Sequence, residues 1–386
     1  MEELLRIDAM AFGGNAVGTR ENGKRCFVRG GVPGDLLKIR IVSDKKNFST
    51  AEIEEIMEPS PDRIKPACPY FGQCPGCSYL NMRYELELEW KQKQFERFLI
   101  HGKLAESSVV KEPLGAPERL GWRNKIRFTF RDGIRGYLGD DNRTLIEIAD
   151  CPLAEMGIRN LAIRTPVPME GSGKITFRSS AAEGALVVTE ENASGLLYER
   201  VLDNEMAVPA GSFFQINKKA FDLLAKEFLA LIDGLEIDLF AELYCGSGTF
   251  SLLAAASGNV KKVLGIELDH LAVKTASENL KGIGTCEKKF VCGDASAMFS
   301  MIRREKAENI LFLVDPPRTG LTPDLCRKIN SSGLRRMIYI SCGPDTLARD
   351  LNLLESGDRP WHVTSTRLVD LFPSTAHFET ITMLER

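Results

Sequence analysis

A cysteine and an aspartate, each placed directly after an apolar run, are the residues of this chain best suited to chemistry. Asp315 follows the apolar run 310–314, and Cys342 follows the run 337–340 with one residue between. Because neighbouring parallel strands end at the same edge of a sheet, we expect the carboxylate and the thiol to lie together. Cysteine is the most nucleophilic side chain, and a helix beginning at Pro344 would favour its thiolate. The spacing therefore predicts a covalent nucleophile at Cys342 rather than a buried packing cysteine.

A glycine-rich loop follows another apolar run and precedes a helical stretch. Residues 242–248 read Glu-Leu-Tyr-Cys-Gly-Ser-Gly, and glycines there allow a sharp turn and the close approach of a ligand. Acids follow the next two runs, at Glu267 and Asp294, where they can bind the ribose and adenine of a nucleoside cofactor. Ser251 stands where a dinucleotide fingerprint has its third glycine. The loop resembles motif I of class I S-adenosylmethionine-dependent methyltransferases, with a nicotinamide cofactor as the alternative.

A nucleophilic cysteine beside a methyl donor suits an acceptor carbon that is otherwise inert. Addition of a thiolate to carbon 6 of a pyrimidine makes carbon 5 a nucleophile that can take the methyl group. A base must then remove the carbon 5 proton so that the thiolate can leave. Near the C-terminus the chain offers the carboxylate of Glu379 and the imidazole of His377, and both stay open as the base.

Four other cysteines have a spacing that suits a metal or a cluster. Cys68, Cys74 and Cys77 follow a Cys-x5-Cys-x2-Cys pattern among proline and glycine residues, and Cys151 comes much later. Four thiolates bind zinc or an iron–sulfur cluster, and spacing alone does not separate the two. The remaining cysteines are expected to be reduced packing residues; they are Cys26, Cys245, Cys286, Cys292 and Cys326.

The elements that carry these residues predict three domains. Short apolar runs separated by glycine turns predict a small β-barrel over residues 1–57. Residues 58–208 predict a sheet-rich central domain that carries the four cysteines. Within it, a helix over 83–103 has an apolar face and a charged face and packs back on the catalytic domain. Residues 209–386 alternate apolar runs with helical stretches from position 237 onward, which predicts an α/β domain with a doubly wound parallel sheet.

The sequences around Asp315, Cys342 and Glu379 together resemble the RNA uracil-5 methyltransferase family. They read Asp-Pro-Pro-Arg at 315–318, Ser-Cys-Gly-Pro-Asp-Thr-Leu-Ala-Arg-Asp at 341–350 and Asp-Leu-Phe-Pro-Ser-Thr-Ala-His-Phe-Glu at 370–379. The likeness implies a Rossmann-like class I methyltransferase domain that methylates carbon 5 of uridine, with Cys342 as nucleophile and Glu379 as base. It also implies cofactor or uracil contacts by Gln215, Tyr244, Gly246, Gly248, Glu267, Asp294 and Asp315, although Tyr244 stands where the family more often has phenylalanine.

One branch of that family carries the two remaining features of the chain. Its N-terminal barrel, the TRAM domain, resembles residues 1–57 in length and glycine pattern. Its four cysteines have the same spacing and hold a four-iron four-sulfur cluster, which favours iron–sulfur over zinc at Cys68, Cys74, Cys77 and Cys151. The likeness also favours large-subunit ribosomal RNA over transfer RNA as the substrate. RNA cytosine-5 methylation is disfavoured because the sequence at 315–318 lacks a second cysteine.

Charge and composition restrict the possible binding partners less than the motifs do. The 386 residues include 50 Lys and Arg against 53 Asp and Glu, a net charge of −3, yet positions 20–46 hold eight cations against three anions. That surplus suits a basic barrel face for RNA or, equally, a solvated barrel face that binds no ligand. Residues 122–128 interleave aromatic and cationic side chains, which suits RNA stacking or a solvated basic strand. No apolar run reaches the about 18 residues of a membrane helix and no secretory signal is visible, so we expect a cytoplasmic monomer without membrane association.

Two other classes of protein remain as alternatives. The first is a non-catalytic RNA-binding or ribosome-assembly factor that keeps the methyltransferase fold, and intact Cys342 and Glu379 argue against it. The second is an iron–sulfur oxidoreductase that uses a nicotinamide, and Ser251 argues against it.

Overall fold

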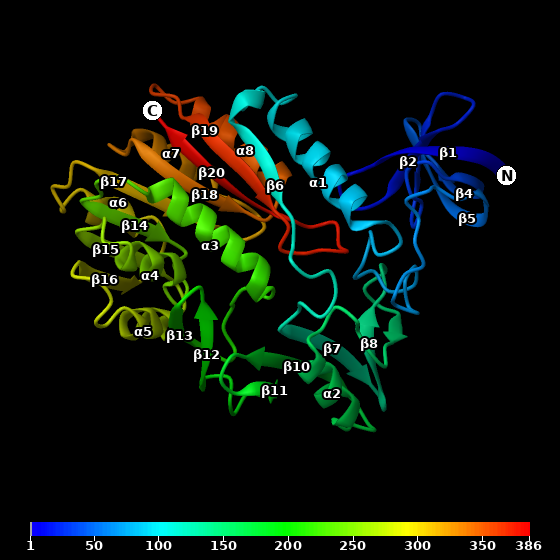
Figure 1. Ribbon diagram of the computed structural model, residues 1–386, viewed down its shortest axis with the longest axis horizontal. Helices are drawn as coiled ribbons and strands as arrows, with labels where there is room; N and C mark the ends of the chain where they lie inside the picture. The colour runs from blue at the N-terminus through cyan, green and yellow to red at the C-terminus, as the bar shows by residue number, and fades with distance from the viewer. Residues whose placement is uncertain (1) are drawn as a thin grey trace.

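A small barrel forms the N-terminal part of the chain. The computed structural model describes residues 2–386, and its first five strands close in the order β1-β2-β3-β5-β4 (Figure 1). Leu5, Ile7 and Val28 fill the interior, each at most 1% exposed, because alternate residues of a strand face the same side. The predicted barrel is therefore confirmed. The strands are β1 (Glu2–Met10), β2 (Ala16–Thr19), β3 (Arg25–Val28), β4 (Leu36–Asp44) and β5 (Phe48–Glu58).

Ion pairs neutralise much of the positive charge that predicted a basic barrel face. Arg25 lies 3.0 Å from Asp8 and Lys24 lies 2.6 Å from Asp44. Folding places acids from other strands and loops beside these cations, so the positive charge of the barrel is less concentrated than the sequence alone indicates. The paired cations are Arg20 with Glu3, Lys24 with Asp44, Arg25 with Asp8, Arg29 with Asp140, and Arg40 with Glu52.

Helix α1 (Tyr84–Leu99) leads from the barrel toward the main sheet, where it packs on strand β6 and helix α8 (Figure 1). Phe95 and Leu99 are fully buried, as an apolar helix face requires. The predicted charged face is present, since Glu85, Glu89, Lys93 and Arg97 are exposed. Glu87 and Lys91 are fully buried instead, because a loop near the C-terminus covers them.

The central part of the chain holds a five-stranded antiparallel sheet in the order β11-β10-β7-β8-β9, with helix α2 packed on β10 and β11. Trp122 and Phe128 are only 3% and 1% exposed, so the predicted stacking of these aromatic rings on RNA is wrong. The elements are β7 (Lys125–Arg131), β8 (Ile134–Leu138), β9 (Leu145–Glu147), α2 (Met156–Arg164), β10 (Ser172–Ser180) and β11 (Gly184–Val188).

The main sheet has eight strands in the order β16-β15-β14-β17-β18-β20-β19-β6. Strands β14 to β18 run parallel, whereas β20 is antiparallel to both β18 and β19. The apolar runs predicted as parallel strands are β14, β15, β17 and β18, which confirms the doubly wound prediction. The strands are β6 (Val110–Leu114), β14 (Leu239–Leu243), β15 (Lys262–Glu267), β16 (Glu287–Cys292), β17 (Ile310–Val314), β18 (Arg336–Ser341), β19 (His362–Val369) and β20 (Glu379–Glu385).

Helices cover both faces of the main sheet and produce two separate apolar cores. Helices α3 and α4 contribute to one core, whereas α1, α6, α7 and α8 contribute to the other. None of the helices in residues 2–386 is long and apolar enough to cross a membrane. The helices are α3 (Lys218–Ile232), α4 (Thr249–Ala256), α5 (His270–Asn279), α6 (Ala297–Ile302), α7 (Pro323–Ser331) and α8 (Pro344–Glu355), and a short 3₁₀ turn covers Ser107–Val109.

Besides helix α1, two further pieces of the range 58–208 lie with the main sheet rather than with the central sheet. Strand β6 pairs with β19 at the edge of the main sheet. The hairpin of β12 (Leu196–Val201) and β13 (Asn204–Pro209) packs on α3 and α5. Domain boundaries drawn along the sequence therefore do not coincide with the domains in space, because the chain contributes strand β6 to the main sheet before it forms the central sheet.

Candidate active site

Three segments meet at the carboxyl edge of the main sheet. Strands β17 and β18 are parallel neighbours, so Asp315 and Cys342 follow adjacent strand ends. Strand β20 pairs antiparallel with β18, with Thr380 opposite Ser341, which places Glu379 beside Cys342. The Thr380 hydroxyl donates to the Ser341 carbonyl oxygen at 3.2 Å and so ties the two strand ends together. The structure thus brings together the predicted nucleophile, the predicted base and Asp315.

Burial and neighbouring carboxylates disfavour ionisation of these three groups. Burial raises the pKa of Cys342 to about 12, and the charge of Glu379 adds to this effect. Burial likewise raises the pKa of Glu379 well above its usual value, with a further contribution from Asp315, whose own pKa burial raises to about 7. Helix α8 does begin at Pro344, but the predicted thiolate is not the resting form of Cys342 at neutral pH, because burial dominates.

Glu379 is better suited than His377 to act as the base. Its Oε2 atom is buried and has no hydrogen-bond partner, which is unfavourable. A ligand that donates a hydrogen bond to this oxygen would remove that cost. Burial, together with the charges of Arg318, Lys91 and Arg123, lowers the pKa of His377 to about 4. An imidazole with so low a pKa is a weak base at neutral pH.

Arg318 is a functional candidate that was not predicted from the sequence. Its positive charge acts to lower the pKa of Cys342, of Glu379 and of His377, so it lies close to all three. The residue is exposed, and its side chain makes no ion pair with any residue in the part of the chain described, 2–386. A cation directly after Asp-Pro-Pro at a strand end was the available signal.

We expect Arg318→Met to slow alkylation of Cys342 by iodoacetamide. Only the thiolate reacts, and loss of the nearby cation raises the thiol pKa further, so the reactive fraction falls. Because the pKa of Cys342 already lies near 12, the rate in the unaltered protein should rise about tenfold per pH unit between about pH 7 and 9. Mass spectrometry of the Cys342 peptide follows this rate separately from the other cysteines. An unchanged profile in Arg318→Met would remove Arg318 from the environment of the thiol.

The glycine-rich loop between β14 and α4 presents its backbone to a ligand. Tyr244, Gly246 and Gly248 all have left-handed backbone angles, with φ of 62°, 51° and 84°. A Cβ on Gly246 would meet no atom within 4 Å, whereas one on Gly248 would lie 3.0 Å from Ala276 of α5. Gly246 therefore faces open space, where its left-handed backbone favours glycine. Gly248 favours glycine for a second reason as well, because helix α5 packs closely against it.

The predicted acidic residues surround the same loop. Glu267 ends β15, and its carboxylate accepts hydrogen bonds from the backbone N–H of Gly246 at 3.1 Å and of Leu268 at 2.7 Å. Asp294 is exposed after β16, and the pKa of Tyr244 is raised by burial first and then by the charges of Asp294 and Glu267 among others. The structure therefore gathers Tyr244, Gly246, Gly248, Glu267 and Asp294 into one candidate cofactor site.

Ser251 has a structural reason to replace the third glycine of a dinucleotide fingerprint. It is fully buried, and its hydroxyl donates a hydrogen bond to the carboxylate of Glu242. Burial raises the pKa of Glu242 to about 8, so this acid needs a donor inside the fold. A glycine at position 251 would leave that carboxyl without this partner.

Gln215 lies in the segment 210–217 between β13 and α3 and is 9% exposed. Its neighbours join this segment to both halves of the site. The Ser212 hydroxyl donates to Asp269 at 2.9 Å, and the Asn217 side chain donates to the carbonyl of Leu371 at 3.0 Å. Phe213, two residues before Gln215, is 75% exposed, an aromatic surface that was not predicted.

The four predicted cluster ligands lie apart from this edge of the sheet. Cys68, Cys74, Cys77 and Cys151 line one cavity of about 250 Å³. All four thiols are free, and burial raises the pKa of Cys77 to about 12. Residues 2–386 contain no group of three or more His, Cys, Asp or Glu side chains arranged to hold a metal ion. The cysteines therefore share a cavity without forming the compact shell that a single ion requires.

The strand order, the single reversed strand and the glycine-rich loop followed by acids define a class I methyltransferase. The fold is shared with the tRNA (uracil-54, C5)-methyltransferase of Pyrococcus abyssi, solved in complex with S-adenosyl-L-homocysteine, at a TM-score of 0.72 and 21% sequence identity over 100% of both chains.

The model of the tRNA (Uracil-5-)-methyltransferase family matches residues 186–386, and the chain belongs to that family. It is accordingly an S-adenosylmethionine-dependent RNA methyltransferase. Similar proteins include an uncharacterized RNA methyltransferase of Clostridium acetobutylicum, 27% identical over 95% of this chain and 93% of that protein. Another, from Clostridium tetani, is 28% identical over 100% of this chain and 98% of that protein.

Proposed function

We propose that this protein methylates carbon 5 of a uridine in large-subunit ribosomal RNA through a covalent Cys342 adduct. The observation that carries the mechanism is the juxtaposition of Cys342 with Glu379, whose buried Oε2 has no partner. The left-handed backbone at Gly246 and the Glu267 carboxylate fit S-adenosylmethionine, which supplies an activated methyl group when bound.

Each bond change in this mechanism has a residue to carry it. The Cys342 thiolate forms a bond to carbon 6, and the electron pair of the carbon 5–carbon 6 double bond moves onto carbon 5 and oxygen 4. Carbon 5 then takes the methyl group, which leaves its sulfonium sulfur as a thioether. The Glu379 carboxylate removes the carbon 5 proton, the double bond re-forms, and the thiolate of Cys342 is expelled.

Neighbouring side chains support these steps. The charge of Arg318 stabilises the thiolate of Cys342, whereas burial of the thiol disfavours it. The exposed ring of Phe213 offers a stacking surface for a base taken out of its helix, and Gln215, two residues later, would supply an amide donor and acceptor for the edge of that base. Target binding would in this way combine a stacking contact with hydrogen-bond recognition.

We further propose that Cys68, Cys74, Cys77 and Cys151 hold a four-iron four-sulfur cluster with a structural role. Zinc would need four sulfurs about 2.3 Å from one centre. The shared cavity of about 250 Å³, lined by all four cysteines, has room for a group larger than a single ion. When bound, such a cluster supplies a fixed cross-link between the loop at 68–77 and the segment at Cys151.

Anaerobically purified protein is expected to be brown and to contain about four iron and four sulfide per chain. Cys77→Ser should lose that absorbance and lower the melting temperature, since the segments the cluster joins would separate. The control Cys286→Ser, in a thiol away from this cavity, should keep the iron. A colourless protein with stoichiometric zinc would contradict the cluster assignment.

The ribosomal target rests on the combination of barrel and cysteine cavity in one chain. Transfer RNA is the second candidate, because the family description and the Pyrococcus abyssi enzyme both name it. We propose that the barrel contributes to RNA binding and that the protein acts as a cytoplasmic monomer. Mapping 5-methyluridine by mass spectrometry in ribosomal and transfer RNA of a deletion strain tests the target: loss from large-subunit RNA supports the proposal, and loss from transfer RNA alone replaces it.

A further inference from the structure

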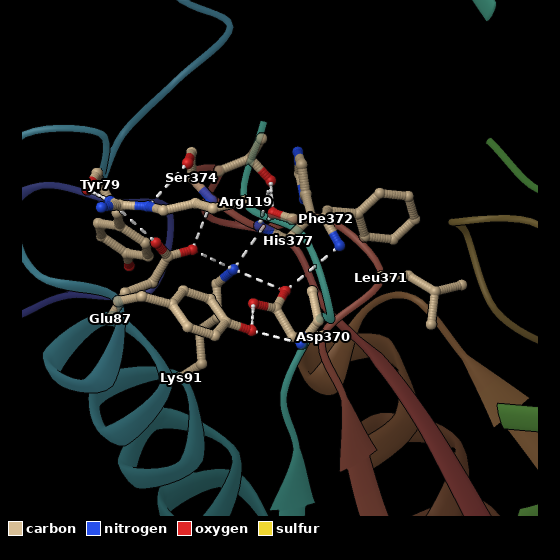
Figure 2. Close-up of polar contacts among 12 residues, drawn as sticks. Tyr79, Glu87, Lys91, Arg119, Asp370, Leu371, Phe372, Ser374 and His377 are labelled. Carbon is tan, nitrogen blue, oxygen red and sulfur yellow. Dashed lines mark hydrogen bonds and ion pairs between the residues drawn. The ribbon is translucent and has the colours of Figure 1, made fainter. Parts of the chain in front are cut away.

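A fully buried lysine holds the β19–β20 loop (residues 370–378) against helix α1 (Figure 2). The ammonium of Lys91 lies 2.8 Å from a carboxylate oxygen of Glu87 and 2.8 Å from one of Asp370. It also donates to the carbonyl oxygen of Phe372 at 3.2 Å. All three charged side chains are 0% exposed, so α1 and the loop are joined inside the protein rather than at its surface.

A second cation balances the charges of this cluster. The guanidinium of Arg119 lies 3.4 Å from Glu87 and donates at 2.6 Å to the carbonyl of Tyr79 and at 3.2 Å to the hydroxyl of Ser374. Two cations therefore face two carboxylates. Any movement that separates one of these buried partners would leave an uncompensated charge inside the protein. The four charges therefore hold α1 and the loop in one arrangement.

The loop is held in a backbone conformation that its sequence does not favour. Ser374 is fully buried with φ of 68°, a left-handed conformation that costs energy for residues with a Cβ. Its N–H donates to Glu87 at 2.6 Å, and its carbonyl accepts from the N–H groups of Ser78 at 3.0 Å and Tyr79 at 3.1 Å. Contacts from outside the loop thus impose its shape.

The first residue of the loop is fixed as firmly. The hydroxyl of Tyr84 donates to Asp370 at 2.9 Å, and the N–H of Asp370 donates to the carbonyl of Leu114 on β6 at 2.9 Å. At the other end, Ala376 packs into the apolar core of the barrel. The loop then leads through Phe378 directly into Glu379, the first residue of β20.

We propose that Lys91 and Asp370 are positioning residues for the base Glu379. The Oε2 atom of Glu379 has no hydrogen-bond partner, so the backbone must hold this side chain in place. Pairing with Val369 and Ser341 holds the start of β20, and the loop before it fixes how the chain enters that strand. Lys91 and Asp370 anchor that backbone, and a base displaced by about 1 Å loses about 10²-fold in rate. This inference rests on the proposed function, because it takes Glu379 as the base.

A charge-balanced double variant, Lys91→Met with Asp370→Asn, tests the inference. It removes one cation and one anion, leaves Glu87 paired with Arg119, and cuts the tie between α1 and the loop. The control is Lys111→Met with Glu227→Gln, which removes a 3.0 Å ion pair between β6 and α3 and also the 2.6 Å contact of Glu227 with Arg367 of β19. Tyr84→Phe is a milder third variant that removes only the hydroxyl contact to Asp370 and to the N–H of Ala116.

The readouts are kcat, the KM for RNA, and the fraction of folded enzyme bound covalently to RNA on a denaturing gel. We expect the Lys91/Asp370 variant to lose about 10²-fold in kcat with little change in KM while the adduct accumulates, because adduct formation needs Cys342 whereas its resolution needs Glu379. Tyr84→Phe should change in the same direction by less, and the control pair should keep the ratio of adduct to turnover of the unaltered enzyme.

A fall of adduct and turnover in proportion in both Lys91/Asp370 and Tyr84→Phe would overturn the positioning role. Glu379→Gln, measured alongside, separates this failure from a failure of the proposed function. If Glu379→Gln accumulates adduct and the network variants do not, the inference is wrong. If Glu379→Gln itself turns over normally, the assignment of the base is wrong, and the inference, which depends on that assignment, is wrong as well.

Discussion

Replacement of Cys342 by alanine is expected to abolish both methyl transfer and the covalent protein–RNA complex. Without the thiolate, carbon 5 of the uracil never becomes nucleophilic, so no other residue can substitute for the missing step. We expect a loss on the order of 10⁶-fold, as large as the loss when other covalent nucleophiles are removed. Transfer of tritium from labelled S-adenosylmethionine to RNA and a denaturing gel of the same reaction measure the two quantities.

Cys286→Ala provides the matched control for this experiment. Cys286 belongs to the same α/β domain but packs in an apolar core away from Cys342, so its removal should lower stability slightly and leave activity per folded molecule unchanged. Binding of S-adenosylmethionine by Cys342→Ala, followed calorimetrically, shows that the fold is intact. Methylation above background by a folded Cys342→Ala protein would contradict the covalent mechanism.

Replacement of Glu379 by glutamine is expected to trap the intermediate that Cys342→Ala prevents. The amide has nearly the same shape but cannot accept the carbon 5 proton, so the adduct forms and does not resolve. Turnover should fall by about 10²- to 10⁴-fold, the usual contribution of a general base. In the unaltered enzyme, release should become faster as the pH rises, because the pKa of Glu379 is raised and only its carboxylate removes a proton.

His377→Gln is the companion variant that distinguishes the two candidate bases. His377 lies two residues before Glu379, and its pKa is lowered to about 4, so we expect its loss to leave the adduct level low. An accumulation of adduct in His377→Gln together with normal turnover in Glu379→Gln would reverse the assignment. The measurement is again the fraction of enzyme that migrates with RNA after denaturation.

Local sequence was sufficient to predict residues at strand ends. Asp315, Cys342 and Glu267 each lie at the end of an apolar run, and the parallel strands of a doubly wound sheet bring their carboxyl ends to one edge. The five-stranded barrel was predictable for a similar reason, since short runs between glycine turns have few ways to bury their apolar faces.

Charged residues were predicted poorly because their partners are distant in the sequence. Lys91 and Glu87 lie on a helix whose other charged residues are mostly exposed, yet Asp370, 279 residues away from Lys91, makes their burial possible. The surplus of barrel cations likewise did not reveal that folding places acids of other strands beside them. Trp122 and Phe128 looked available for stacking but fill the interior around the central sheet.

The sequence by itself determined which atoms can react: a thiol at Cys342, a carboxylate at Glu379, a cofactor loop at 242–248 and four further thiols. Covalent chemistry depends on residue type, and residue type is local information. Only the tertiary structure decided the pKa values, the hydrogen-bond partners and the positions of these groups. It set the raised pKa of Cys342, the unpaired oxygen of Glu379 and the buried network that holds the β19–β20 loop. Burial, electric fields and backbone restraint arise from residues far apart in the chain, so they exist only once the chain has folded.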